Sequence, residues 1–270
     1  MLHVSNIVKT FGRDTPDEVR ALQGVSLEVD PGSFVIVIGT NGSGKSTFLN
    51  AVAGTFLVDD GSIAIDGTDI TRWPEHRRAA LIGRVFQNPF SGTAPNMSIA
   101  ENLALAVRRG QPRGLGWALN RRLVDELKAR VATLNMRLED RLEQPIGSLS
   151  GGQRQALTLL MASWLRPKLL LLDEHTAALD PKSADAVVRL TDEIVARDRL
   201  TALMVTHSMP QAVNFGDRLV MMHRGRAIHD FRGAEKRRLR VDDLITRFEE
   251  VRRADQLDET AAEMLEQMYV

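Results

Sequence analysis

Hydrophobic and polar residues alternate along the chain in patterns that predict a series of short strands and helices. Alternation over residues 2–8 predicts a first strand, and a second is expected at residues 25–29. Residues 34–38 and 169–172 form unbroken apolar runs, which are typical of parallel strands buried on both faces. The remaining strands are expected at residues 62–65, 84–87 and 201–205, with a hairpin at 218–223 and 226–231.

Two regions show helical spacing instead. From Met97 to Leu142, apolar residues recur every three or four positions around a turn-rich interruption at residues 110–116, which predicts a helical insertion into an α/β core. Beyond residue 232 two amphipathic helices are expected to dock onto the chain's own core or onto a partner. Their apolar positions are Val241, Leu244, Ile245, Phe248 and Val251 in the first, and Leu257, Ala261, Met264, Leu265 and Met268 in the second.

Composition narrows the class of protein. The chain has 270 residues, and 35 lysines and arginines balance 35 aspartates and glutamates, so no overall field attracts nucleic acid or anionic lipid. There is no cysteine, which excludes disulfides and thiolate metal sites. The first residues lack the pattern of a signal peptide, and no apolar run reaches about 18 residues. We therefore expect a cytoplasmic chain with no nucleic-acid partner.

The strongest chemical signal follows the apolar run at residues 34–38. Gly39-Thr40-Asn41-Gly42-Ser43-Gly44-Lys45-Ser46-Thr47 matches the pattern of a phosphate-binding loop, and a helix is predicted to begin after Lys45, at Ser46. Glycines allow backbone N–H groups to converge on phosphate oxygens, and Lys45 adds a full positive charge. Ser46 would offer its hydroxyl to Mg²⁺. A glycine-rich turn with an incidental lysine is the alternative, which the flanking strand and helix disfavour.

Polar residues also follow three other predicted strands. Gln87 ends one strand before a proline, Asp173 and Glu174 end the leucine run, and His207 follows residues 201–205. Ligands bind beyond the carboxyl ends of strands in such sheets, so one carboxylate could serve Mg²⁺ and the other accept a proton from an attacking water. A lone histidine is more often structural, but the position of His207 beside these groups favours a functional role.

A second anion-binding pattern lies at Leu149-Ser150-Gly151-Gly152-Gln153, where a Ser-Gly-Gly turn begins a helix. The simpler interpretation is that Ser150 is an ordinary helix cap. One chain does not need two phosphate sites, so the pattern suggests a nucleotide shared between two copies. Phe11, predicted to lie in a turn, would either fold back onto the sheet or form a platform for a nucleotide base.

Taken together, these motifs resemble those of ABC-transporter nucleotide-binding subunits over residues 2–232. The matching pieces are GTNGSGKST, Phe86-Gln87, LSGGQ, LLLLDE, AALD with Asp180, and Thr206-His207. The resemblance implies an α/β fold with a P-loop NTPase core of ABC type in residues 1–232. An N-terminal antiparallel β subdomain, a helical subdomain at about residues 90–148 and a C-terminal helical extension at 233–270 would complete it.

The resemblance also implies roles for single residues. Phe11 would stack on adenine, the loop from Gly39 to Thr47 and Lys45 in particular would bind phosphates, and Ser46, Gln87 and Asp173 would serve Mg²⁺. Glu174 would position or deprotonate the attacking water, His207 would hold the γ-phosphate, and Gln87 would belong to the catalytic residues as well. Residues Leu149 to Gln153 would close the partner copy's site in a homodimer, with Asp180 relaying between the two.

The implied function is an ATPase subunit of a bacterial importer, peripheral on the cytoplasmic face of the membrane. It would act with a separate permease and a periplasmic or lipoprotein solute-binding protein. His175 stands where family members usually carry proline, and this variation resembles a branch labelled as tryptophan/tyrosine-type or uncharacterised amino-acid importers. An exporter subunit, a non-transport ABC ATPase and a phosphate-loop kinase are the alternatives, and the kinase leaves LSGGQ unexplained. Nothing in the chain identifies the solute.

Overall fold

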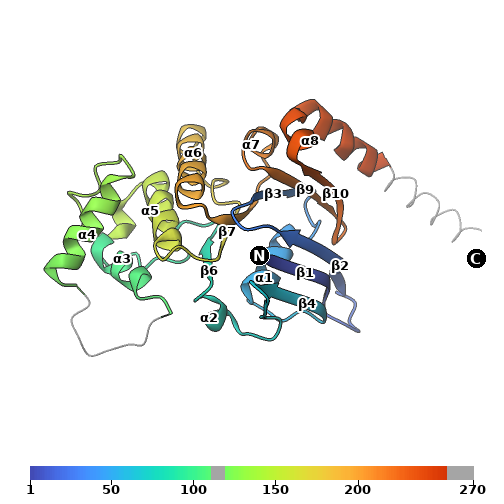
Figure 1. The fold of residues 1–270 in the computed structure, drawn as a ribbon, viewed down its shortest axis with the longest axis horizontal. Helices are drawn as coiled ribbons and strands as arrows, with labels where there is room; N and C mark the ends of the chain where they lie inside the picture. Colours follow the sequence, from blue (N-terminus) through green and yellow to red (C-terminus); the bar gives the residue numbers. More distant parts are fainter. Residues whose placement is uncertain (111–118, 254–270) are drawn as a thin grey trace, which may run out of the picture.

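The larger of the two β-sheets in the described part of the chain has six strands (Figure 1). The computed structural model describes residues 1–110 and 119–253. Within them the larger sheet has the order β10-β9-β3-β8-β7-β6, parallel except for β10. Its strands are β3 (Phe34–Gly39), β6 (Ile82–Val85), β7 (Leu169–Asp173), β8 (Thr201–Val205), β9 (Arg218–His223) and β10 (Arg226–Arg232). The four leucines of β7 are buried between β6 and β8, so the prediction of a central parallel strand is confirmed.

The smaller sheet is antiparallel, in the order β2-β1-β4-β5. Its strands are β1 (Leu2–Phe11), β2 (Val19–Val29), β4 (Asp60–Ile65) and β5 (Thr68–Asp69). Here two sequence predictions were wrong, because β1 continues to Phe11 and β2 begins at Val19 rather than near residue 25. Phe11 and Val19 pair across the strands. Shifts of register between Val4 and Thr10 break the alternation of side chains on which the prediction rested.

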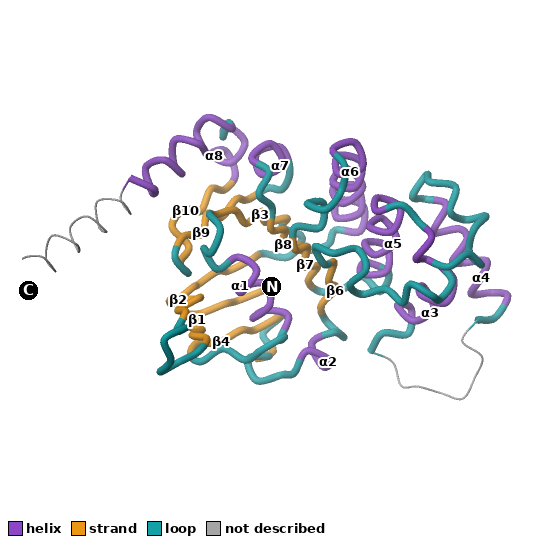
Figure 2. Tube along the Cα trace, turned by 180° about the vertical axis from the view of Figure 1, so that it is seen from behind, coloured by secondary structure: helices purple, strands orange, loops and turns teal. Residues whose placement is uncertain are grey.

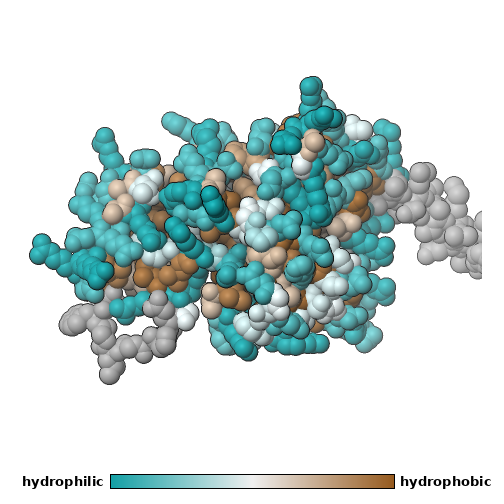
Figure 3. All heavy atoms as spheres, viewed as in Figure 1, coloured by the Kyte–Doolittle hydropathy of each residue, from teal (hydrophilic) through white to brown (hydrophobic). Residues whose placement is uncertain are grey.

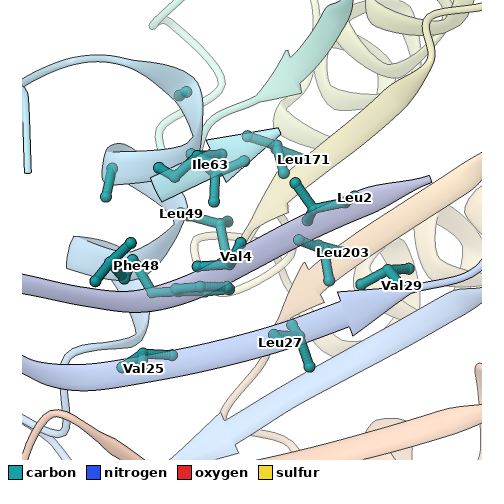
Figure 4. Close-up of a cluster of buried hydrophobic side chains, with 14 of the residues drawn as sticks. Leu2, Val4, Val25, Leu27, Val29, Phe48, Leu49, Ile63, Leu171 and Leu203 are labelled. Atoms are coloured by element: carbon teal, nitrogen blue, oxygen red, sulfur yellow. The ribbon is translucent and has the colours of Figure 1, made fainter. Parts of the chain in front are cut away.

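Helix α1 (Lys45–Ala53) lies between the two sheets. Figure 4 shows its Phe48 and Leu49 among side chains from β1, β2 and β4 and from the strands β7 and β8 of the larger sheet. These side chains are buried and form one apolar cluster that joins both sheets to the helix. The start of α1, where the phosphate loop ends, is therefore fixed by a core on both sides.

A second group of helices gathers at the other end of the molecule, as Figure 2 shows from behind. It comprises α3 (Ile99–Val107), α4 (Arg121–Ala132), the short 3₁₀ helix η1 (Ile146–Ser148) and α5 (Gly151–Ser163). Leu103, Leu127, Val131 and Leu160 belong to a separate buried cluster within this group. The predicted helical insertion thus exists, while its boundaries at about residues 90–148 stay a prediction.

The remaining helices each follow a strand along the chain. They are α2 (Glu75–Arg78), α6 (Pro181–Asp198), α7 (Met209–Asn214) and α8 (Gly233–Arg238), followed by a helical segment at residues 241–253. In this last segment Leu244 is fully buried, and Phe248 and Val251 pack against the sheet cluster that contains Ile36. The second predicted tail helix, from Leu257 to Met268, lies outside the described residues. None of the helices in the described ranges combines the length and the hydrophobicity that a membrane-spanning helix needs.

Candidate nucleotide site

The parallel strands β3, β6, β7 and β8 bring their carboxyl ends to one edge of the larger sheet. The phosphate loop (residues 39–47) follows β3, and Gln87 follows β6. Asp173 and Glu174 lie at the end of β7, and His207 follows β8. The four motifs that the sequence pattern placed at strand ends are therefore neighbours on one edge, where ligands of such sheets bind.

The backbone of the phosphate loop requires glycine at two positions. Gly44 adopts φ +95°, and a Cβ atom there would lie 2.5 Å from the carbonyl oxygen of Ala21. A Cβ on Gly39 would lie 2.2 Å from the carbonyl oxygen of Met222. Lys45, only 4% exposed, donates hydrogen bonds from Nζ to the carbonyl oxygens of Gly39 and Thr40 at 3.0 and 2.9 Å. The loop is thus closely packed around its lysine.

The loop has the features that a phosphate group would use. Asn41 and Gly42 are exposed, and a Cβ on Gly42 would meet no atom within 4 Å, so a ligand can approach the backbone there. The hydroxyl of Ser43 is buried and lacks a hydrogen-bond partner among the described residues. Thr47 lies in the first turn of α1, whose N-terminus favours anions. Burial lowers the pKa of the Lys45 ammonium, although Glu174 and Asp173 act in the opposite direction.

Ser46 and Asp173 are brought together by α1 and β7. The Ser46 hydroxyl donates to Oδ1 of Asp173 at 3.3 Å. Burial raises the pKa of the Asp173 carboxyl, and the nearby Arg84 guanidinium opposes that rise. A hydroxyl beside a carboxylate, next to a phosphate loop, matches the ligands that Mg²⁺ takes when nucleotide phosphates complete its shell.

Arg84 was not among the residues predicted from sequence. Its Nη2 lies 3.9 Å from Oδ2 of Asp173 and donates to the side-chain oxygen of Asn50. Its Nη1 donates to the hydroxyl of Thr55 at 3.0 Å. The sequence feature that could have indicated it is a charged residue in the short strand β6, which pairs with the leucines of β7. Arg84 therefore holds Asp173 in place against α1.

Glu174 and His207 are in direct contact at the ends of β7 and β8. Oε1 of Glu174 lies 2.6 Å from Nε2 of His207. Glu174 adopts φ +44°, an uncommon conformation for a residue with a side chain, and its backbone N–H donates to Val205 at 3.1 Å. Such conformations cluster at functional sites, where the surrounding structure enforces them. The carboxylate is thereby turned toward the end of β8.

His175, which replaces the usual proline, is 1% exposed. The Thr191 hydroxyl donates to the Val187 carbonyl at 2.8 Å, so its oxygen must accept from Nε2 of His175 at 3.0 Å. Nδ1 is then the unprotonated nitrogen, and it is buried without a partner among the described residues. Burial lowers the pKa of His175 to about 4, so the ring is neutral at physiological pH.

Gln87 is exposed and makes no hydrogen bond to Ser46 or Asp173 among the described residues, so its predicted place beside Mg²⁺ stays a prediction. The neighbouring carbonyl of Phe86 accepts from Nε2 of the fully buried Gln155 on α5 at 3.2 Å. Gln155 was not predicted from the sequence. The feature that could have indicated it is a polar residue within an otherwise apolar stretch of helix. The segment after β6 is thus tied to the helix that begins at the Ser-Gly-Gly turn.

The segment Leu149 to Gln153 (the signature segment) begins α5. Ser150 caps the helix and forms a reciprocal capping box with Gln153, which is the simpler role considered for it. Cβ atoms on Gly151 and Gly152 would meet Leu179 and Ser183 at 3.0 Å, so this helix start lies against the turn that ends at Asp180. Asp180 itself caps α6 through the N–H of Ser183. No hydrogen bond among the described residues joins the signature segment to the phosphate loop.

Phe11 lies at the end of β1, 39% exposed. Its ring meets Phe56 edge-on, with centroids 5.2 Å apart, and the ammonium of Lys9 lies 5.5 Å from both ring centroids. One face of an aromatic pair is therefore available at the edge of the smaller sheet, where a flat base could stack.

Known proteins share this arrangement. A family model described as ABC transporter matches residues 22–177, more than half of the chain. The chain belongs to this family. It is an ABC ATPase, as its motifs suggested, and the predicted P-loop NTPase fold of ABC type is confirmed.

Individual relatives of this ABC ATPase include transport proteins of two bacteria. The tyrosine transport ATP-binding protein of Clostridioides difficile (strain R20291) is 41% identical over 249 residues, covering 92% of this chain and 99% of that protein. The fructose import ATP-binding protein FrcA of Rhizobium meliloti is 32% identical over 233 residues, covering 84% and 86%. The dimeric post-hydrolysis structure of the ATP-binding cassette MJ0796 with ADP and Pi has a TM-score of 0.73 at 26% identity, covering 86% of this chain and 98% of that one.

Proposed function

We propose that this ABC ATPase is the ATP-hydrolysing subunit of a bacterial importer for an amino acid or a related small molecule. The observation that carries the proposal is the near-complete, 41% identical match to a tyrosine transport protein, together with the intact set of motifs at one sheet edge. The subunit would bind a separate membrane permease from the cytoplasmic face, and a periplasmic or lipoprotein solute-binding protein would deliver the solute.

In the hydrolysis step, Glu174 is the proposed general base. A water oxygen attacks the γ-phosphorus, the bond from that phosphorus to the bridging oxygen breaks, and ADP and phosphate leave. The water's proton passes to the Glu174 carboxylate, which His207 orients through the 2.6 Å contact. Lys45 and the N–H groups of the phosphate loop balance the charge of the phosphate oxygens, and Phe11 stacks on the base. Bound Mg²⁺ would neutralise phosphate charge, with Ser46, Asp173 and Gln87 as its proposed ligands.

Two copies would complete each site. The signature segment makes no hydrogen bond to its own phosphate loop among the described residues. Its Ser150 and Gly151 are exposed, so this helix start is available to the nucleotide of a partner. A symmetric pair then holds two equivalent nucleotides between the phosphate loop of one copy and Ser150, Gly151 and Gly152 of the other. Asp180 would relay between the two sites.

The permease would dock on the segment that follows β6 and on the helical region beside it. Phe90 is 51% exposed and Leu105 is 58% exposed. On the face shown in Figure 3, hydrophobic atoms gather over the region of α3. The Arg154 guanidinium lies 3.8 Å from the Phe90 ring centroid and donates to the Gly147 and Leu149 carbonyls at 2.7 and 3.0 Å. A partner that moves Phe90 would thereby move the start of the signature segment.

Transport assays test this function. The tagged chain, extracted from membranes with mild detergent, should co-purify with a permease, and vesicles containing the complex should accumulate labelled tyrosine or another amino acid only with ATP. A matched complex carrying Glu174→Gln should bind ATP without accumulating solute. Export of the solute, or recovery of the chain with ribosomes or DNA in place of a permease, would contradict the proposal.

A further inference from the structure

The helical segment at residues 241–253 (the tail helix) forms one wall of a hollow of about 680 Å³ beside the nucleotide site. Figures 1 and 2 show this helix following α8 and lying beside α7. The other walls come from the phosphate loop and from the segment after β8. The lining side chains and loop residues that matter here are Thr40, Asn41, His207, Ile245, Phe248 and Arg252.

The tail helix uses most of its apolar positions inside its own chain. Leu244 is fully buried, and Phe248 and Val251 pack on the sheet core. Ile245 is left 44% exposed at the edge of the hollow. A single exposed isoleucine is ordinary on a protein surface. Ile245 differs because it lines the same hollow as the phosphate loop and His207, which belong to the proposed nucleotide site.

We propose that the tail helix belongs to the dimer interface and that the hollow receives the turn at residues 177–180 of a second copy of this chain. The inference rests on the proposed composite site. In that site the phosphate loop and His207 face the partner's signature segment, and in this chain Gly151 and Gly152 lie against Leu179 and Ser183. A partner that brings its signature segment to the phosphate loop therefore brings this turn to the hollow.

The chemistry of the two surfaces is complementary. The turn presents Ala177 and Ala178, two small exposed apolar residues that fit beside Ile245. Asp180 and Lys182 follow, both exposed, and the tail helix carries Arg252 and Glu249 at the hollow. Each surface thus offers an apolar centre with one charge of each sign, an arrangement that favours one docking orientation over others.

Dimerisation of the full-length chain tests the proposal. In the Glu174→Gln background with Mg²⁺ and ATP, analytical ultracentrifugation gives the dimer dissociation constant. Adding Ile245→Asp should raise that constant at least about tenfold, because the change removes buried apolar surface and buries a carboxylate. Thr246→Asp is the matched control, since the adjacent Thr246 is exposed, lies outside this hollow and should leave the constant unchanged. Binding of a fluorescent ATP analogue by the monomer should be equal in all three variants.

Other outcomes separate the alternatives. A dimer equally tight with Ile245→Asp overturns the proposal while leaving the composite site intact. If the parent Glu174→Gln chain stays monomeric with ATP, both the composite site and this inference fail. A chain that ends after residue 253 supplies the last comparison: if Ile245→Asp has no effect there, the hollow holds the chain's own terminal residues and the inference is wrong.

Discussion

At the scale of single residues, Glu174 shows how the site is assembled. Its left-handed backbone is held by the hydrogen bond to Val205, and its carboxylate contacts His207 from the same neighbouring strand end. The strain of such a conformation costs on the order of 1 kcal/mol and persists only where the surroundings enforce it. β8 therefore fixes both the backbone and the side chain of the proposed base.

Glu174→Gln is expected to lower ATP hydrolysis by about a hundredfold or more, since the amide keeps the shape of the side chain but loses its basicity. Equilibrium binding of ATP should stay close to that of the unchanged protein, because the proposed role begins only when water attacks. Phosphate release and ATP binding would be measured on the same preparation. Near-normal turnover in this variant would show that another group removes the proton.

His175 predicts a pH dependence of stability. Its pKa is about 4 in the folded protein and 6.5 for an unperturbed histidine, so the unfolded chain takes up the proton first as the pH falls. This contribution to stability is complete above about pH 7.5 and is lost as the pH falls from 6.5 toward 4. From about pH 7.5 to about pH 5 the loss should be about 2 kcal/mol.

The control for this effect is His175→Gln, which can still donate to Thr191 but does not titrate. Its free energy of unfolding, measured by urea titration at each pH, should fall less steeply than that of the unchanged protein over the same range. Parallel curves for the two proteins would mean that His175 is not held neutral by burial.

The site residues that could be predicted from sequence were those that lie directly beside a recognisable local pattern. Asp173, Glu174 and His207 directly follow apolar strand runs, and Lys45 follows its glycines. Arg84 and Gln155 act through residues far away in sequence, on Asp173 and on the carbonyl of Phe86. Local patterns carry no information about such contacts, so these residues emerged only from the fold.

At the scale of elements, the turn between β9 and β10 supports the phosphate loop. The N–H of Gly225 donates to the Ser43 carbonyl at 3.0 Å, and the Gly225 carbonyl accepts from Gln23 of β2 at 2.8 Å. Gly225 adopts φ +71°, and a Cβ there would lie 2.8 Å from the Ala21 carbonyl oxygen. The turn thus links the loop to the smaller sheet.

Gly225→Ala should weaken ATP binding by about tenfold, because the new methyl group separates the turn from β2 and loosens the loop. Gly67→Ala is the matched control: its φ of +76° is equally left-handed, but its Cβ would meet nothing within 4 Å. Both changes should cost about 1 kcal/mol of stability for the backbone conformation alone. Isothermal titration with ATP separates them, and equal affinities would refute the supporting role of the turn.

Elements with at least one buried face were the easiest to predict. The apolar runs of β3 and β7 and the spacing of α3 and α4 gave the correct element types, because burial imposes a periodicity on the sequence. The N-terminal half of β2 escaped prediction, since its exposed residues are free to be polar and its partner β1 shifts register. For the same reason Phe11 was placed in a turn although it lies in a strand.

At the scale of the whole molecule, the two halves of the proposed composite site belong to different cores. The phosphate loop rests on the cluster shared by both sheets and α1, and the signature segment begins a helix of the separate helical cluster. α5 packs on α6 and β6, and a third buried cluster joins these elements through Leu159, Ile194 and Val85. The signature segment can therefore face outward toward a partner while the phosphate loop stays fixed.

Mixing two inactive variants tests whether sites are shared. Lys45→Ala removes the phosphate charge from one copy, and Ser150→Arg blocks the signature segment of the other, so neither homodimer should trap nucleotide. In a mixed dimer, the intact loop of the second copy meets the intact signature segment of the first, and one site per dimer is restored. Trapping of labelled nucleotide should appear only in the mixture, and trapping by a strictly monomeric protein would exclude sharing.

The separation of the two cores also bears on how such a chain changes over generations. Substitutions that share no contacts contribute almost independently to the free energy of folding. Variation on the outer surfaces of α3 and α4 can thus accumulate without disturbing the packing of Phe48 and Leu49 that holds the start of α1. A descendant could acquire a surface for a different membrane partner through substitutions in the helical cluster. The cluster around α1 would meanwhile keep the phosphate loop and its ATPase chemistry unchanged.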